Sequence, residues 1–127
     1  MPFSERRKYP RVAEAIQCQV SIGGVAGTET VTQNLSCGGA LCSLSEIFPP
    51  MTKLEIVLDL PASPGFGGSP RQSVRCVGVV LRQDRLHLEE NPKYLTAIYF
   101  SDLKAEDRRR IGEFVLQSML SHDRRRS

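Results

Sequence analysis

The chain has 127 residues, of which 40% are hydrophobic and 24% are charged, and its formal net charge is +3. This length and composition indicate one globular domain with a single core, and they exclude a disordered chain and a histone-like polycation. No apolar run approaches the roughly 18 residues of a membrane helix, and the N-terminus lacks the apolar core of a secretory signal. We therefore expect a cytoplasmic protein without membrane insertion.

The first segment of the chain is basic: Arg6, Arg7, Lys8 and Arg11 lie within six residues. A run of like charge is most often a solvated surface segment. Pro10 excludes regular helix here and favours an extended backbone before it, from which Arg7 and Arg11 can reach one anionic ligand. The segment is therefore either a solubilising tail or an anion-binding arm.

Six segments have the pattern of β-strands, because apolar and polar residues alternate in them or β-branched residues predominate. In chain order they are 15–22, 30–36, 40–46, 53–60, 73–83 and 93–100. A glycine-rich turn at 23–29 and a loop rich in glycine, proline and serine at 61–70 separate strands. Short strands at roughly ten-residue intervals predict an antiparallel sheet closed into a barrel.

Only the C-terminal segment has a helical period. The apolar stripe of this helix consists of residues three or four positions apart: Ile111, Phe114, Val115, Ser118 and Met119. Acidic residues near its start and arginines after its end suit the helix dipole. We predict a helix over 104–121 that packs this stripe on the barrel, followed by a basic tail over 122–127.

The sequence gives little support for catalysis or for a bound metal. The four cysteines include no Cys-x-x-Cys pair and both histidines are far from them, which argues against a zinc site. No histidine lies near a nucleophile in a recognisable arrangement, and the glycine-rich segments lack the features of phosphate-binding and dinucleotide-binding loops. We expect neither an enzyme nor a cofactor. Cysteines in the strand segments are expected to pack as small hydrophobes.

A short polar segment, "NLSCGG", lies at the junction of two predicted strands. Asn34 and Ser36 carry short polar side chains, and Gly38 and Gly39 permit a positive φ and the close approach of a ligand to the backbone. These residue types are also standard in hairpin turns. Alone, the segment is therefore either an ordinary turn or part of a ligand site.

The two features together are more specific than either alone. An N-terminal Arg-x-x-x-Arg followed some 20 residues later by Asn-x-Ser-x-x-Gly between strands resembles the PilZ domain family, and Thr96 to Val115 looks like the family's last strand and C-terminal helix. Ala97 and Lys104 depart from the family's usual glycine and serine, outside the binding motifs. The resemblance covers nearly all of the chain.

The resemblance implies a mainly β fold, a six-stranded antiparallel β-barrel with a C-terminal α-helix packed on it. It also implies one domain over residues 1–121. In this domain the arm takes residues 1–12, the barrel 13–103 and the helix 104–121.

The resemblance also implies a receptor for the bacterial second messenger cyclic di-GMP. An arginine fork matches the adjacent O6 and N7 acceptors of guanine, pairs with phosphate and stacks on a base. By the resemblance, Arg7 and Arg11 recognise the ligand, and the second motif contacts the other guanine and the backbone. The expected ligand-binding residues are Arg6, Arg7, Arg11, Asn34, Ser36, Gly38 and Gly39. Arg6 either favours a stacked pair of ligand molecules or faces solvent.

Two alternatives stay open beside this hypothesis. A protein-interaction adaptor of the same fold that binds no nucleotide is one, and the intact motifs argue against it. A weak nucleic-acid binder is the other, and the scarcity of aromatic residues among the basic clusters argues against it. In the leading hypothesis, ligand binding orders the arm and makes a surface for a downstream protein partner, which the sequence does not name.

Overall fold

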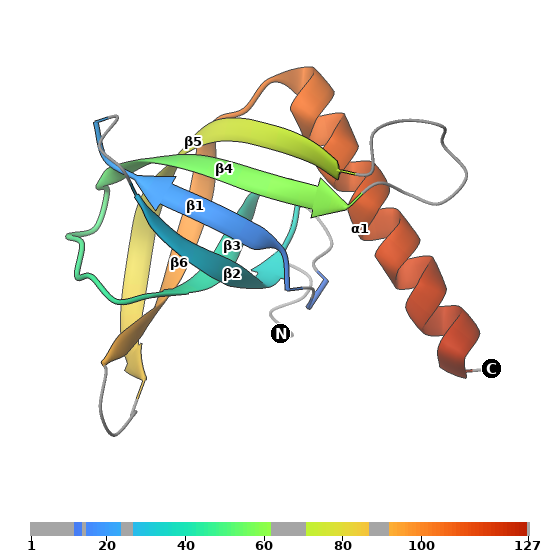
Figure 1. Cartoon of the computed structure of the whole chain (residues 1–127), viewed down its shortest axis with the longest axis horizontal. Coiled ribbons are helices and arrows are strands. Elements are labelled where there is room, and N and C mark those ends of the chain that lie inside the picture. The colour runs from blue at the N-terminus through green and yellow to red at the C-terminus, as the bar shows by residue number, and fades with distance from the viewer. Residues whose placement is uncertain (1–11, 14, 24–26, 62–70, 87–91, 127) are drawn as a thin grey trace, which may run out of the picture.

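A computed structural model of the chain describes residues 12–13, 15–23, 27–61, 71–86 and 92–126 (Figure 1). In this part of the chain the elements are β1 (Gln17–Ser21), β2 (Thr28–Leu35), β3 (Gly39–Leu44), β4 (Lys53–Pro61), β5 (Arg71–Leu86), β6 (Lys93–Asp102) and α1 (Ala105–Arg126). All six strands expected from the alternation of apolar and polar residues are present, with bounds that differ by a few residues.

The strands form one closed barrel in the order β1-β2-β3-β6-β5-β4, and every pair is antiparallel. β1 closes the ring against β4, with Cys18 opposite Leu58. β5 is long because it pairs with β4 through its first half and with β6 through its second. Register shifts at Val77/Gly78 and Val80/Arg82 let this strand bend around the barrel. The predicted six-stranded antiparallel barrel with a C-terminal helix is confirmed.

The barrel interior is filled by alternate residues of each strand. On β4, four alternate side chains are buried, and they are Leu54, Ile56, Leu58 and Leu60. Three cysteines lie in the same core, as expected for small hydrophobes: Cys18, Cys42 and Cys76. A hydrogen bond with Cys42 and burial raise the pKa of Cys18, and burial, with nearby Asp107 and Asp102, raises the pKa of Cys76 to about 12.

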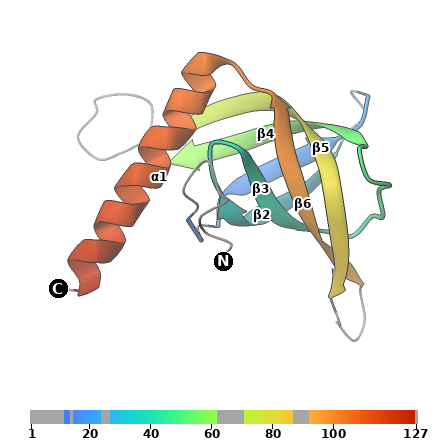
Figure 2. The ribbon, with the colours of Figure 1, turned by 180° about the vertical axis from the view of Figure 1, so that it is seen from behind.

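Helix α1 lies beside one end of the barrel (Figures 1 and 2). Ile111 and Val115 are buried in the barrel core, and Phe114 packs partly against it. Met119 was expected on the same stripe, but it is 40% exposed. The reason is the helical period, which rotates Met119 by about 80° from Ile111 around the axis and so carries it off the buried face.

The helix also continues beyond its predicted end. Residues 122–126 were expected to form a tail but are the last turn of α1. No glycine or proline follows Gly112 in the sequence, so nothing in the residue types ends the helix at 121. Within the described part of the chain, no helix combines the length and apolarity needed to cross a membrane.

Candidate functional site

The "NLSCGG" segment forms the connection between β2 and β3 at the end of the barrel that α1 covers. Ser36 is buried here, and its side chain is used within the turn. Its Oγ accepts the N–H groups of Gly38 at 3.1 Å and Gly39 at 3.3 Å, while its own N–H donates to the Gly39 carbonyl at 2.9 Å. Ser36 therefore fixes the backbone of the turn.

Gly39 lies where β6 passes close to the turn. Its φ lies outside the left-handed region, and among the described residues the glycine with a positive φ is Gly23, not Gly38 or Gly39. A Cβ on Gly39 would lie 2.1 Å from the carbonyl oxygen of Ile98 on β6. The positive φ that glycine permits is therefore not used at Gly39, and the glycine is needed because β6 passes against it. Phe100 donates its N–H to Gly38 O at 2.9 Å, which ties the turn to β6 as well.

Asn34 lies on β2 directly after an irregularity of the sheet. The register between β2 and β3 shifts between Thr32 and Asn34, so Asn34 pairs with Leu41. Such a bulge re-aims the side chains that follow it. The Asn34 amide is half-buried and makes no hydrogen bond with the described residues, so its donors and acceptor can serve a ligand.

The first described residue of the chain lies beside this turn. Val12 forms an isolated bridge with Leu35, in which Val12 N donates to Leu35 O at 3.0 Å and Leu35 N donates to Val12 O at 2.9 Å. Both side chains are buried. Arg6, Arg7 and Arg11 lie outside the described residues. The bridge nevertheless shows that the chain enters the barrel next to the turn, immediately after the Arg-x-x-x-Arg motif in the sequence.

Helix α1 holds the other side of the turn. Arg108 Nη1 donates to the carbonyl of Cys37 at 3.1 Å, and Cys37 Sγ donates to the carbonyl of Arg108 at 3.5 Å. A Cβ on Gly112 would be 3.3 Å from the same sulfur. Burial raises the pKa of Cys37, and the Arg108 guanidinium partly offsets this. The turn is thus clamped between β6 and α1.

Sequence reasoning missed Cys37 and Arg108 as parts of this site. Cys37 occupies an unspecified position of the second motif, and Arg108 is one of three consecutive arginines. Helical phase distinguishes Arg108 from Arg110. Arg110 pairs with Glu106 at 2.8 Å and with Asp107 at 3.0 Å on its own helix, whereas Arg108 reaches the turn. A helical wheel could have found this difference, although not the residue that Arg108 contacts.

What the described residues offer at this site is a turn held by hydrogen bonds, a side-chain amide and the residue that follows the basic segment. Hydroxyl, amide and backbone groups can orient a polar ligand by hydrogen bonding. In the parts of the chain that the structure describes, no three histidine, cysteine or acidic residues are grouped so as to hold a metal ion. The arrangement therefore fits ligand recognition.

Comparison with known families and structures gives a consistent result. The sequence model of the PilZ domain family matches residues 5–117. The structure resembles that of MotI/DgrA, an inhibitor of motility from Bacillus subtilis, with a TM-score of 0.73 and 20% identity over 91% of this chain and 52% of that one. No curated protein matches the sequence significantly.

Complexes with c-di-GMP are among the similar structures. The complex of K. pneumoniae MrkH with c-di-GMP has a TM-score of 0.72 and 19% identity, over 94% of this chain and 55% of MrkH. The PilZ domain of Escherichia coli YcgR with c-di-GMP has a TM-score of 0.63 and 13% identity, over 94% of this chain and 96% of that domain. At these identities the likeness establishes the fold, and this chain spans about half the length of MotI and MrkH.

Proposed function

The chain belongs to the PilZ domain family, and on that premise we propose that it is a cyclic di-GMP receptor whose ligand binds between the N-terminal arm and the β2–β3 turn. Arg7 and Arg11 of the arm recognise the ligand in this proposal, and Arg6 adds a third guanidinium. Asn34 contacts the ligand from the turn, and Ser36, Gly38 and Gly39 shape the backbone that it approaches.

The observation that carries the proposal is the bridge between Val12 and Leu35. Leu35 lies between Asn34 and Ser36, so the residue that follows the first motif lies beside the second, although the two motifs are some 20 residues apart in sequence. A chain spans at most about 3.6 Å per residue, so the Cα atom of Arg7 lies within roughly 18 Å of that of Val12. This distance keeps both arginines within range of a dinucleotide seated on the turn.

The chemistry of the two motifs is complementary to that of the ligand. Two phosphates and two guanines offer anionic oxygens and paired acceptors, which guanidinium groups bind bidentately. The half-buried Asn34 amide has a donor and an acceptor for a base edge. The described turn is already held by Ser36 and by Arg108, so little of its own ordering has to be supplied by binding. Ligand-bound MrkH and YcgR share the fold.

In this proposal the protein signals through a partner. Cyclic di-GMP acts as a ligand and not as a cofactor, and no chemical step is assigned to the domain. The ligand neutralises the like charges of the arm and fixes it on the rim of the barrel, which creates a surface for a downstream protein.

Titration calorimetry with cyclic di-GMP, GTP and a single-stranded oligonucleotide tests the proposal. We expect saturable binding of cyclic di-GMP alone. Absence of cyclic di-GMP binding would favour the adaptor of the same fold. Binding of the oligonucleotide with a strong salt dependence would favour a nucleic-acid binder.

A further inference from the structure

One face of the sheet runs from the β2–β3 turn across three neighbouring strands, β2, β3 and β6 (Figure 2). Asn34 on β2 pairs with Leu41 on β3, and Leu41 pairs with Ala97 on β6. Gly39, the last residue of the second motif, pairs with Tyr99, two residues further along β6. Side chains of directly paired residues point to the same face of a sheet. These two rows of residues therefore belong to one face.

This face is the outside of the barrel. The row of paired residues between the two, which consists of Leu35, Ala40 and Ile98, belongs to the hydrophobic core or packs against it. Successive side chains of a strand point to opposite faces, so the residues on either side of this row point outward. The Asn34 amide, which the proposed function assigns to the ligand, therefore shares the outer face with Tyr99.

Tyr99 is open to solvent on this face, with a residue exposure of 52%. Its neighbours are small. Gly39, opposite it on β3, has no side chain, and Ala97, the preceding residue of β6 on the same face, has only a methyl group. An accessible aromatic ring with small neighbours offers a flat surface on which a nucleic-acid base can stack.

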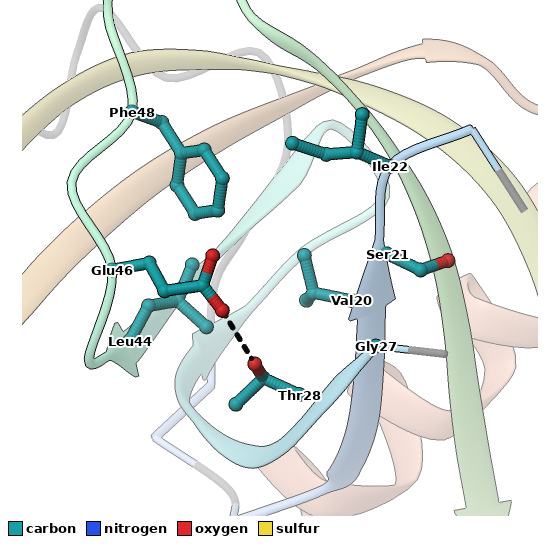
Figure 3. Close-up of a pocket in the computed structure, with 8 residues that line it drawn as sticks. All are labelled: Val20, Ser21, Ile22, Gly27, Thr28, Leu44, Glu46 and Phe48. Carbon is teal, nitrogen blue, oxygen red and sulfur yellow. Dashed lines mark hydrogen bonds between the residues drawn. The ribbon is translucent and has the colours of Figure 1, made fainter. Parts of the chain in front are cut away.

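The other aromatic residues that the structure describes are less suited to this role. Phe100 is buried in the core, and Phe114 packs partly against it. Tyr94 is half-buried and pairs with the last residue of β3, at the end remote from the turn. Phe48 follows that end and lines a pocket of about 410 Å³ together with Glu46 (Figure 3). A carboxylate in this lining repels a ligand that carries two phosphates.

The spacing between Asn34 and Tyr99 suits a single ligand. Tyr99 lies two strands across and two residues along from Asn34. Neighbouring strands are about 4.8 Å apart and each residue adds about 3.4 Å along a strand, which places the two Cα atoms roughly 12 Å apart. A cyclic dinucleotide carries its two bases on opposite sides of one sugar–phosphate ring. One base can therefore lie on Tyr99 while the rest of the molecule reaches Asn34.

We propose that Tyr99 is the stacking platform for one guanine of cyclic di-GMP. The inference rests on the proposed function and extends that site from the turn onto the outer face of β6. Stacking on an aromatic ring tolerates any base, so Tyr99 contributes affinity. The choice of guanine then falls to the groups that bind base edges, the guanidinium groups of the arm and the Asn34 amide.

Titration calorimetry of the full chain with cyclic di-GMP tests this. Tyr99→Ala should bind about five- to a hundredfold more weakly than the wild type, because it loses the stacked ring. Tyr99→Phe should bind within about twofold of the wild type, since it keeps the ring and loses only the hydroxyl. Ile47→Ala is the matched control at an exposed apolar residue beyond the other end of β3, and it should bind like the wild type. Tyr99→Leu replaces Tyr99→Ala if circular dichroism shows that the alanine variant does not fold.

Nuclear Overhauser effects supply a measurement that a structural role of the ring would not produce. In the wild-type complex, the ring protons of Tyr99 should contact a base proton of guanine. Weaker binding by Tyr99→Ala without such contacts would overturn stacking. Weak binding by Tyr99→Phe would do so too, in favour of a hydrogen bond from the hydroxyl.

The same titrations separate this inference from the proposed function. A wild type that binds no cyclic di-GMP would overturn both. A wild type that binds, with Tyr99→Ala within twofold of it, would overturn the inference alone, and the ring would then only cover the backbone beside Gly39.

Discussion

The main chain of Val12 exchanges two hydrogen bonds with Leu35, at 3.0 Å and 2.9 Å. This bridge joins the residue that follows Arg11 to the residue between Asn34 and Ser36. The residue that follows the arm therefore lies beside the β2–β3 turn, although β1, a turn and most of β2 separate the two in sequence.

Replacing Arg7 or Arg11 with alanine should weaken cyclic di-GMP binding and leave the fold intact, because both residues precede the barrel. Each loses a charge-assisted contact that contributes about 1.5–3 kcal/mol, or roughly ten- to a hundredfold in affinity. Lysine at either position should not restore binding, since it keeps the charge and loses the fork. Calorimetry measures the affinity, which should also fall as salt rises.

Arg75→Ala is the matched control, because Arg75 is exposed on β5 and belongs to a second Arg-x-x-x-Arg with Arg71. It should bind cyclic di-GMP like the wild type. An Arg7 or Arg11 variant that bound within twofold of the wild type would show that the arm has no part in recognition.

Asn34→Ala and Ser36→Ala should differ in what they change. The Asn34 amide has no hydrogen-bond partner among the described residues, so its loss should lower affinity by about 0.5–1.5 kcal/mol with little effect on unfolding. The Ser36 hydroxyl satisfies two backbone N–H groups of the turn, so its loss should lower both the melting temperature and the affinity. Equal melting temperatures for the two variants would contradict this division of roles.

Gly39→Ala should destabilise the free protein by about 1–3 kcal/mol, the usual cost of overpacking. The added Cβ would lie 2.1 Å from Ile98 O, so β6 or the turn must move. Gly23→Asn is the control, because Gly23 has a φ of 61°, which asparagine tolerates, and a Cβ there would meet nothing within 4 Å. Chemical denaturation without ligand measures both, and an unperturbed Gly39→Ala protein would refute the steric explanation.

Arg108→Ala should lower the free energy of unfolding by about 1–2 kcal/mol, because Cys37 O loses a charge-assisted hydrogen bond at a half-buried position. It should also reduce cyclic di-GMP affinity, because the turn is no longer held against α1. Arg109→Ala is the control, since Arg109 is exposed on the same helix.

The same contact makes a prediction for hydrogen exchange. Cyclic di-GMP should protect amides in the arm, in the turn and in α1 around Arg108 to Gly112, in the wild type and less so in Arg108→Ala. Protection that stops at the turn would mean that α1 does not respond to the ligand.

Cys37 should report ligand binding by its reactivity. It is half-buried and its pKa is raised, so its thiolate fraction at pH 8 is smaller than that of an ordinary cysteine, and its alkylation should speed up as the pH rises further. The buried Cys18, Cys42 and Cys76 should stay unlabelled in the folded protein. Mass spectrometry after iodoacetamide treatment should show slower labelling of Cys37 with cyclic di-GMP, and an unchanged rate would argue against a ligand on the turn.

Much of the fold could be predicted because its signals are local. Alternation gave all six strands, and the spacing of Ile111 and Val115 gave the buried face of the helix. The length of β5 could not be predicted, since it depends on two bulges that follow the closure of the barrel. Met119 was misplaced because an apolar residue near the edge of a helical stripe can lie on either side of the burial boundary.

The sequence predicts the candidate site as two motifs but not as a three-dimensional arrangement. The residue types drew attention to Ser36 and Gly39. The structure explains why these residues are needed in the turn: Ser36 forms hydrogen bonds within it, and β6 passes close to Gly39. The clamp between Cys37 and Arg108 joins distant parts of the sequence, and no local pattern shows that Arg108 contacts Cys37. Non-local contacts of this kind become visible only once the barrel is closed.

The order of the strands has a consequence for how the protein folds. β3 pairs with β6 although the chain forms β4 and β5 between them, and β1 must find β4 to close the ring. Such long-range pairing loses loop-closure entropy before the stabilising contacts form. Barrels therefore fold slowly among small proteins, in times on the order of milliseconds to seconds. Until β6 arrives, β3 and β5 have unpaired edges that can recruit strands of other chains. The nascent protein is thus most exposed to aggregation while its last strand is still missing.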